Sequence, residues 1–196
     1  MESILLDLPD QIETERLLIR VPRPGDGQAI FEAVKESHPR LKPWFPWAQK
    51  VSSREEYEIH MRKQHANFLL KTDMMLLLFL KETGKLIGSS GLHPRGWEVP
   101  KFEIGYWIRT GYEGKGYVIE AVEGITRFGF ETVGAKRIMI RCDERNIRSQ
   151  SVAKRAGYLY EGMFRNYEPR WDGDGLTNMM YFAMTETDYN LKTLTN

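Results

Sequence analysis

The stretch GYEGKGYVIEAV, residues 111–122, sets three glycines within six residues directly before an apolar pattern of helical spacing. Glycine costs backbone entropy, so this loop indicates a ligand that needs a bare, closely approachable backbone. The first turn of a helix has free N–H groups and the positive end of the helix dipole, which makes a phosphate the expected ligand. A turn that only connects two elements is the alternative. Neither the P-loop pattern nor the GxGxxG dinucleotide pattern occurs here.

The segments on either side of this loop predict alternating strands and helices. Strands are expected over 15–21, 74–81, 85–92, 101–109, 135–142, 158–168 and 177–186, and helices over 27–37, 52–71, 117–128 and 146–157. Hairpins give antiparallel strands, whereas the strand–helix–strand unit over 102–142 needs a right-handed crossover between parallel strands. We therefore expect an α/β (α+β) fold of order β-α-α-β-β-β-α-β-α-β-β, with one mixed, mostly antiparallel, twisted sheet of about seven strands and flanking helices. A ligand is expected beyond the carboxyl ends of the strands, where the glycine loop lies.

Length and composition limit the class of protein. The 196 residues, with ordinary apolar and charged fractions, suit one globular domain over 1–196. The net charge of +1 provides no bulk basic field, so we expect no direct nucleic-acid binding. The single cysteine, Cys142, excludes an internal disulfide and fits a cytoplasmic location. No membrane association is expected, because the N-terminus lacks a basic signal-peptide region and the longest apolar run, Met74–Leu80, is too short to cross a bilayer.

Two blocks of sequence together resemble a known family. The stretches EIGYWIRTGYEGKGYVIEAV (103–122) and RIMIRCDERNIRSQSVAKRAGYLYEG (137–162) are similar to the GNAT superfamily of N-acetyltransferases. More narrowly, together with ETERLLIR (13–20) and LKPWFPW (41–47), they resemble the RimJ/RimL group of ribosomal-protein N-terminal acetyltransferases. The likeness covers about 13–185, which we take as the core of the domain.

The resemblance implies acetyl-CoA (coenzyme A) as co-substrate and no metal. Its pyrophosphate loop falls on residues 113–118, where Glu113 and Val118 depart from the commonest choices. The residues that the resemblance and the loop place against the cofactor are Trp107, Ile108, Arg109, Gly114, Lys115, Gly116, Tyr117, Val118, Asn146 and Ser149.

Acetyl transfer to an amine requires a proton acceptor, a polarised carbonyl and a stabilised leaving thiolate. Glu103 is the expected base, because the resemblance places an acid on this strand; a glutamate that only pairs with a neighbouring strand is the alternative, and Glu168 is the second candidate base. Backbone N–H groups over 107–109 are the expected polarisers, where the strand should splay from its neighbour. Many members of the superfamily carry a tyrosine where this chain has Ala153, so the resemblance points to Ser149 as the thiolate donor, with helix capping as its alternative role. Cys142 is more simply a buried strand cysteine than a nucleophile.

The acceptor side is less determined. Trp44, Phe45 and Trp47 lie in a proline-stiffened loop and either wall an acceptor pocket or hold two helices together. An α-amino group has a pKa of about 7.7–8.0 against about 10.4 for lysine, so one glutamate suffices for a protein N-terminus. A ribosomal-protein N-terminus is the expected acceptor; a polyamine or other small amine, or a non-catalytic acyl-CoA-binding module, remains open. The resemblance also implies a homodimer. The four histidines show no metal-binding spacing, and His93 is more simply a loop residue than a site residue.

Overall fold

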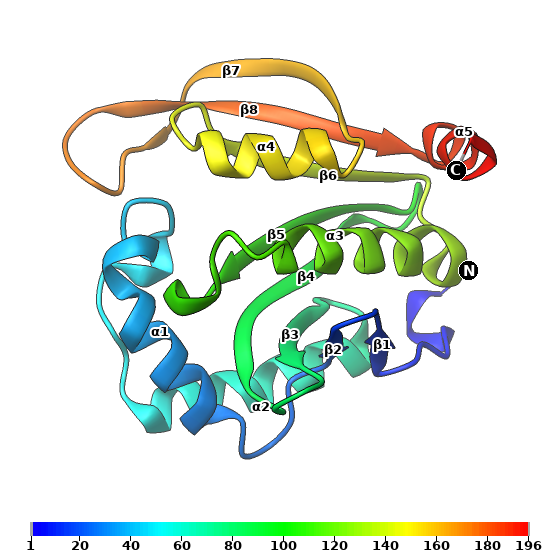
Figure 1. Cartoon of the computed structure of the whole chain (residues 1–196). Helices are drawn as coiled ribbons and strands as arrows, with labels where there is room; N and C mark the ends of the chain where they lie inside the picture. The colour runs from blue at the N-terminus through cyan, green and yellow to red at the C-terminus, as the bar shows by residue number, and fades with distance from the viewer. Residues whose placement is uncertain (1, 196) are drawn as a thin grey trace.

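Within residues 2–195, eight strands form one sheet in the order β1-β2-β3-β4-β5-β6-β8-β7, and only β5 and β6 pair in parallel (Figure 1). A computed structural model describes residues 2–195 of the chain. The strands are β1 Gln11–Glu13, β2 Leu17–Arg20, β3 Met75–Leu80, β4 Leu86–Gly96, β5 Lys101–Ile108, β6 Arg137–Asp143, β7 Leu159–Pro169 and β8 Leu176–Thr185. The predicted fold class is confirmed.

The number of strands differs from the expected seven. The extra strand, β1, forms a short hairpin with β2 and pairs Ile12 with Ile19. It has three residues, of which Gln11 and Glu13 are exposed, so it carries too little apolar alternation to be predicted. A helix also follows β8, over Glu186–Thr195 (α5), in a segment for which no helix was predicted.

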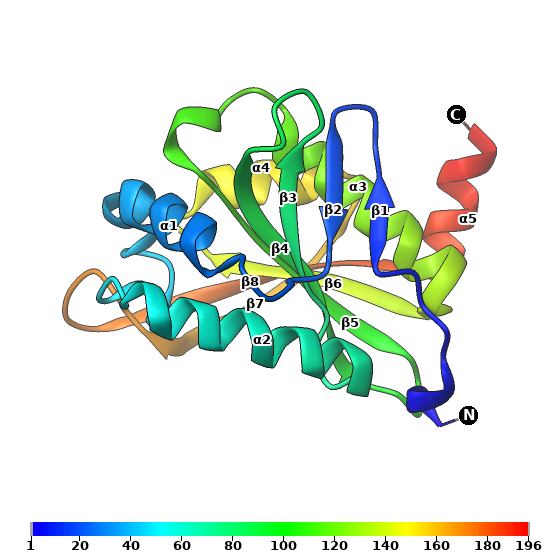
Figure 2. The ribbon, with the colours of Figure 1, turned by 90° about the horizontal axis from the view of Figure 1, so that it is seen from below.

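Helices cover both faces of the sheet (Figure 2). The helices are α1 Gly27–Leu41 and α2 Arg54–Leu70 on one face, and α3 Tyr117–Phe128 and α4 Ile147–Arg155 on the other. Helix α2 begins with a full capping box between Ser53 and Glu56, as its sequence predicts. No helix within residues 2–195 combines the length and the apolar character that a bilayer crossing requires.

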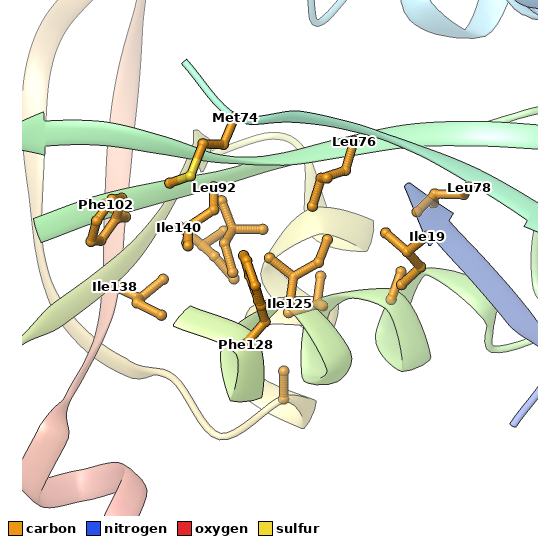
Figure 3. Packing of buried hydrophobic residues seen from close by; sticks show 14 of the residues in the cluster. Ile19, Met74, Leu76, Leu78, Leu92, Phe102, Ile125, Phe128, Ile138 and Ile140 are labelled. Atoms are coloured by element: carbon orange, nitrogen blue, oxygen red, sulfur yellow. The ribbon is translucent and has the colours of Figure 1, made fainter. Parts of the chain in front are cut away.

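The main core lies between the sheet and α3. Ile125 and Phe128 of α3 pack against strand residues such as Leu92, Phe102 and Ile138 (Figure 3). A smaller cluster, which includes Ile30, Met61, Leu77 and Trp107, lies under α1 and α2. Because both faces are buried, β3 reads as a continuous apolar run, as the sequence suggested.

The parallel pair β5–β6 separates along its length. Its register runs only over Lys101–Glu103 and Arg137–Met139, although β5 continues to Ile108 and β6 to Asp143. Figure 1 shows the two strands meeting at one end and diverging towards the other. The expected splay is therefore present, and the glycine loop leads from the open end of β5 into α3.

Candidate active site

A cavity of about 800 Å³ occupies the space between the separated strands. Its walls include residues 103–108 of β5, residues 140–143 of β6, and residues 146–149 at the start of α4. Nine of the site residues expected from the sequence line it: Trp44, Phe45, Glu103, Trp107, Ile108, Val118, Asn146, Ser149 and Glu168.

The glycine loop offers a row of free donors at one end of this cavity. Gly114 and Gly116 have φ values of +74° and +83°, which side chains rarely tolerate. The backbone N–H groups of residues 114–119 donate to no acceptor within the described part of the chain. Free N–H groups at a helix start form an anion site. Lys115 adds a positive charge, and its Nζ lies 5.3 Å from the ring centre of Tyr112.

Charged neighbours hold the loop in place. Arg148 of α4 forms an ion pair with Glu113 at 2.8 Å, so the acid that departs from the family pattern is neutralised by an opposite charge. Arg16 donates to the carbonyl oxygen of Lys115 at 3.0 Å and forms an ion pair with Glu120 at 2.6 Å. Its guanidinium also lies 4.5 Å from the ring centre of Tyr117. These contacts anchor the loop from outside and leave its N–H groups free.

Ser149 lines the cavity at the start of α4 and faces Tyr106 of β5. Its backbone N–H donates to the Asn146 side chain at 3.1 Å, so Asn146 caps α4 and the Ser149 hydroxyl does not. That hydroxyl lies 3.0 Å from the hydroxyl of Tyr106, which also donates to the Ser149 carbonyl at 3.1 Å. Burial raises the pKa of Tyr106, and the hydrogen bond to Ser149 opposes the shift. The pair is a neutral, proton-bearing group facing the gap.

Glu103 is buried and is held by two arginines. Arg95 donates to one carboxylate oxygen at 2.9 Å (Nη2) and 3.0 Å (Nε), and Arg141 donates to the other at 2.8 Å. Arg141 also reaches Glu168 at 2.7 Å, so the two candidate bases share one arginine. Burial alone would lower the pKa of Arg141, but the adjacent carboxylates outweigh it and raise that pKa.

The direction of each backbone N–H over 107–109 decides which of them can polarise a carbonyl group in the gap. The N–H of Arg109 donates to the Ile87 carbonyl at 2.7 Å and is therefore turned towards β4. Because successive N–H groups of a strand point to opposite sides, the N–H of Ile108 points away from β4 and into the gap. The Arg109 side chain forms an ion pair with Glu36 and does not line the cavity.

The tryptophan-rich loop divides between two places. Trp44 and Phe45 line the cavity, and Arg145 lies 5.8 Å from the ring centre of Trp44. Trp47 instead packs on Phe45 and Trp107, with ring centres 5.2 and 6.2 Å away, and lines a neighbouring cavity. The loop thus contributes both to the wall of the cavity and to packing against β5.

Several cavity residues were not expected. The cavity is also lined by Tyr106, Arg141, Arg145, Arg148 and Trp171, none of which is among the site residues predicted from the sequence. Alternation along β6 places Arg141 on the same side as Met139 and Asp143. This alternation is the one sequence signal that could have placed Arg141 at the cavity.

The chain is similar in sequence and in fold to known proteins. The family model of the acetyltransferase (GNAT) domain matches residues 16–159. The Bacillus subtilis "Putative ribosomal N-acetyltransferase YdaF" is 31% identical over 78% of this chain and 82% of its own length. The Escherichia coli alanine N-acetyltransferase of ribosomal protein uS5 is 25% identical over 91% and 92%. A solved RimL ribosomal-protein α-N-acetyltransferase in complex with coenzyme A superposes with a TM-score of 0.83 at 21% identity, over 89% of this chain and 97% of that one.

Proposed function

The chain belongs to the GNAT acetyltransferase family, and on that premise we propose that it transfers the acetyl group of acetyl-CoA to the α-amino group of a protein N-terminus, such as that of a ribosomal protein. The observation that carries the proposal is the meeting of free loop N–H groups, separated strands and the Ser149–Tyr106 pair around one cavity. Relatives named for ribosomal-protein acetylation support the choice of acceptor.

The residues present fit acetyl-CoA as a bound co-substrate. The N–H groups of residues 114–119, with Lys115, suit a pyrophosphate, and a Cβ at Gly114 would meet no atom within 4 Å, so the backbone there is open to approach. The gap between β5 and β6 suits an extended arm, whose amides require strand-like partners. Bound acetyl-CoA supplies an activated thioester.

Three tasks then fall to residues of this chain. Glu103 takes the proton of the attacking amine, directly or through water, with Glu168 as the second candidate. The N–H of Ile108 stabilises negative charge that develops on the carbonyl oxygen. The Ser149 hydroxyl, backed by Tyr106, donates to the departing thiolate.

We propose an α-amino acceptor because a larger fraction of such amines is already deprotonated at neutral pH. At neutral pH roughly a tenth of an α-amino group is already uncharged, whereas lysine is almost wholly protonated. Both oxygens of Glu103 already accept hydrogen bonds from arginines, so the carboxylate is a weak base. A weak base can help an α-amino group to lose its proton more readily than it can deprotonate a lysine ammonium.

The test is thiol release from acetyl-CoA with three acceptor sets in parallel: N-terminal peptides, peptides with an internal lysine and a blocked N-terminus, and polyamines. We expect turnover with the first set, and mass spectrometry should place the acetyl group on the α-nitrogen. Turnover of polyamines alone would assign a small-amine acetyltransferase, and binding of acetyl-CoA without any turnover would assign a binding module. We further propose that the protein acts in the cytoplasm. We also propose that it forms a homodimer, and the exposed apolar side chains of β7 support this second proposal.

A further inference from the structure

A second cavity, of about 490 Å³, lies between the α1–α2 pair and the sheet face formed by β3, β4 and β5. It shares Phe45, Gly105, Tyr106 and Trp107 with the cavity of the candidate active site. The two cavities therefore adjoin along β5, in the part of that strand that has separated from β6.

Two glycines of β4 and β5 lie beside His93, which lines the second cavity. Gly91 of β4 is paired directly with Gly105 of β5. A Cβ at Gly91 would lie 2.6 Å from Cε1 and Nε2 of His93, and a Cβ at Gly105 would lie 3.7 Å from the same Nε2. The two glycines thus make room for the ring, and Nε2 lies over the strand that both cavities share. His93 is part of β4, which extends beyond the strand predicted from the sequence, and is not a loop residue.

Asp73 determines which ring nitrogen of His93 carries the proton. Its Oδ1 lies 2.5 Å from Nδ1 of His93. Burial raises the pKa of Asp73, but the hydrogen bonds that its carboxylate accepts from His93 and from the Met74 N–H oppose that effect, and the pKa is lowered, so the group is a carboxylate at neutral pH. Nδ1–H therefore donates to Asp73, and in the neutral ring Nε2 keeps a lone pair. Within residues 2–195 nothing is hydrogen-bonded to Nε2.

The surroundings favour a ligand that donates hydrogen bonds. The ionisable side chains that line the second cavity, within the described residues, are Glu56, Tyr57, His60, Asp73 and His93, and no lysine or arginine is among them. Burial lowers the pKa of His60, so this ring is uncharged, and Glu56 is engaged in the cap of α2. Trp47 and Trp107 provide apolar walls.

We propose that the second cavity is a specificity pocket for the acceptor, in which Nε2 of His93 accepts a hydrogen bond from a hydroxyl on the residue that carries the reacting α-amino group. The inference rests on the proposed function. The hydroxyl of an N-terminal serine lies close to its own amine, and the two cavities share Gly105, which has no side chain. An acceptor without the hydroxyl leaves Nε2 unpaired, and a site built for a hydroxyl discriminates against such a ligand.

The kinetic test compares two peptides that differ only in a first residue of serine or alanine. We expect wild-type kcat/KM to favour serine by at least about tenfold. His93→Leu should bring the ratio close to one, whereas His93→Gln, whose amide oxygen also accepts, should keep part of it. His65→Leu is the matched control, because His65 bonds to the Pro22 carbonyl and lines neither cavity. Each serine-to-alanine ratio of kcat/KM is measured on one protein preparation. A variant that is only partly folded therefore lowers both values equally and leaves the ratio unchanged.

A binding measurement separates this inference from the proposed function. The chain has four histidines, so the imidazole C–H signals can be assigned by comparison with His93→Leu. In protein saturated with coenzyme A, serinamide should shift the His93 signals and alaninamide should not. A serinamide-specific shift without peptide turnover would support the pocket and overturn the N-terminal acetyltransferase. Equal wild-type kcat/KM for the two peptides, an unchanged ratio in His93→Leu, or no serinamide-specific shift would overturn the pocket.

Discussion

Glu103 is held by arginines from two neighbouring strands, so a substitution of Glu103 affects turnover through two possible causes. Glu103→Gln removes the proton acceptor and also disturbs the contacts to Arg95 and Arg141. We expect a loss of about 10²–10⁴-fold in turnover at neutral pH, which shrinks as pH rises and the amine deprotonates unaided. Arg95→Gln is the control, because it removes one of the two arginines and keeps the carboxylate. Equal losses in both variants would show that Glu103 only holds the strands, and Glu168→Gln would then be the next variant.

The Ser149 hydroxyl is free to act because Asn146 already caps the helix. Ser149→Ala should therefore slow the single-turnover rate, with little change in the Kd of acetyl-CoA and a stability loss of about 1 kcal/mol for the lost hydrogen bond. Tyr106→Phe should also slow that step if the tyrosine backs the donor. Single-turnover kinetics, calorimetry and thermal melting on both variants measure the three effects. A wild-type single-turnover rate in Ser149→Ala would exclude the donor role.

Cys142 lies beside this pair but is poorly suited to be a nucleophile. Burial raises the pKa of its thiol to about 11, although a hydrogen bond with Ser149 lowers it in part. Because the thiolate forms only as pH approaches that value, its fraction at pH 7 is about 10²-fold below that of a free cysteine with a pKa of about 8.5. We expect slow alkylation by iodoacetamide at pH 7, rising steeply above pH 9 by intact-mass analysis. Rapid alkylation at pH 7, or loss of turnover in Cys142→Ala, would contradict this.

The glycine backbone at the start of α3 is expected to bind the pyrophosphate of coenzyme A. Gly116 has a φ of +83°, and a Cβ there would lie 3.3 Å from Nη2 of Arg16. Gly116→Asp adds a negative charge among the N–H groups of residues 114–119 and should weaken coenzyme A binding by more than tenfold. Gly134→Asp is the matched control: its φ is +78° and its Cβ would meet nothing within 4 Å. Both changes place a side chain in the left-handed region, at about 1–2 kcal/mol. Unchanged affinity in a folded Gly116→Asp protein, by calorimetry, would remove the phosphate from this loop.

The sequence predicted these elements well where the signal is local. Glycine spacing and helical periodicity located α3, and the strand that carries Glu103 was predicted over 101–109, close to the observed β5. It could not show which side chains meet across strands, since that depends on register. The contacts of Glu103 with Arg95 and Arg141, and of Asp73 with His93, join residues of different elements and follow only from the assembled sheet. Trp47 was grouped with Trp44 for the same reason, although the turn between them sends it to the other cavity.

The edge of the sheet formed by β7 exposes large apolar side chains. β7 is the last strand in the sheet order, and large apolar side chains along it are exposed, among them Leu159, Tyr160 and Phe164. An exposed apolar edge strand favours pairing with another chain. Because α4 and β8 lie next to β7 in the fold, such pairing would also brace the wall of the active-site cavity that includes Glu168.

We therefore expect a dimer in solution, with about twice the chain mass of 22.9 kDa by light scattering at micromolar concentration. Phe164 is 55% exposed and packs edge-on against Tyr181, with ring centres 4.8 Å apart. Phe164→Asp places a charge in the apolar patch, so it should shift the mass to that of one chain. Leu69→Asp is the matched control: Leu69 is 56% exposed on α2, which lies on the sheet rather than on its β7 edge, so this variant should remain a dimer. A wild-type mass of one chain at 100 µM, or dissociation by both variants alike, would show that β7 is not the interface.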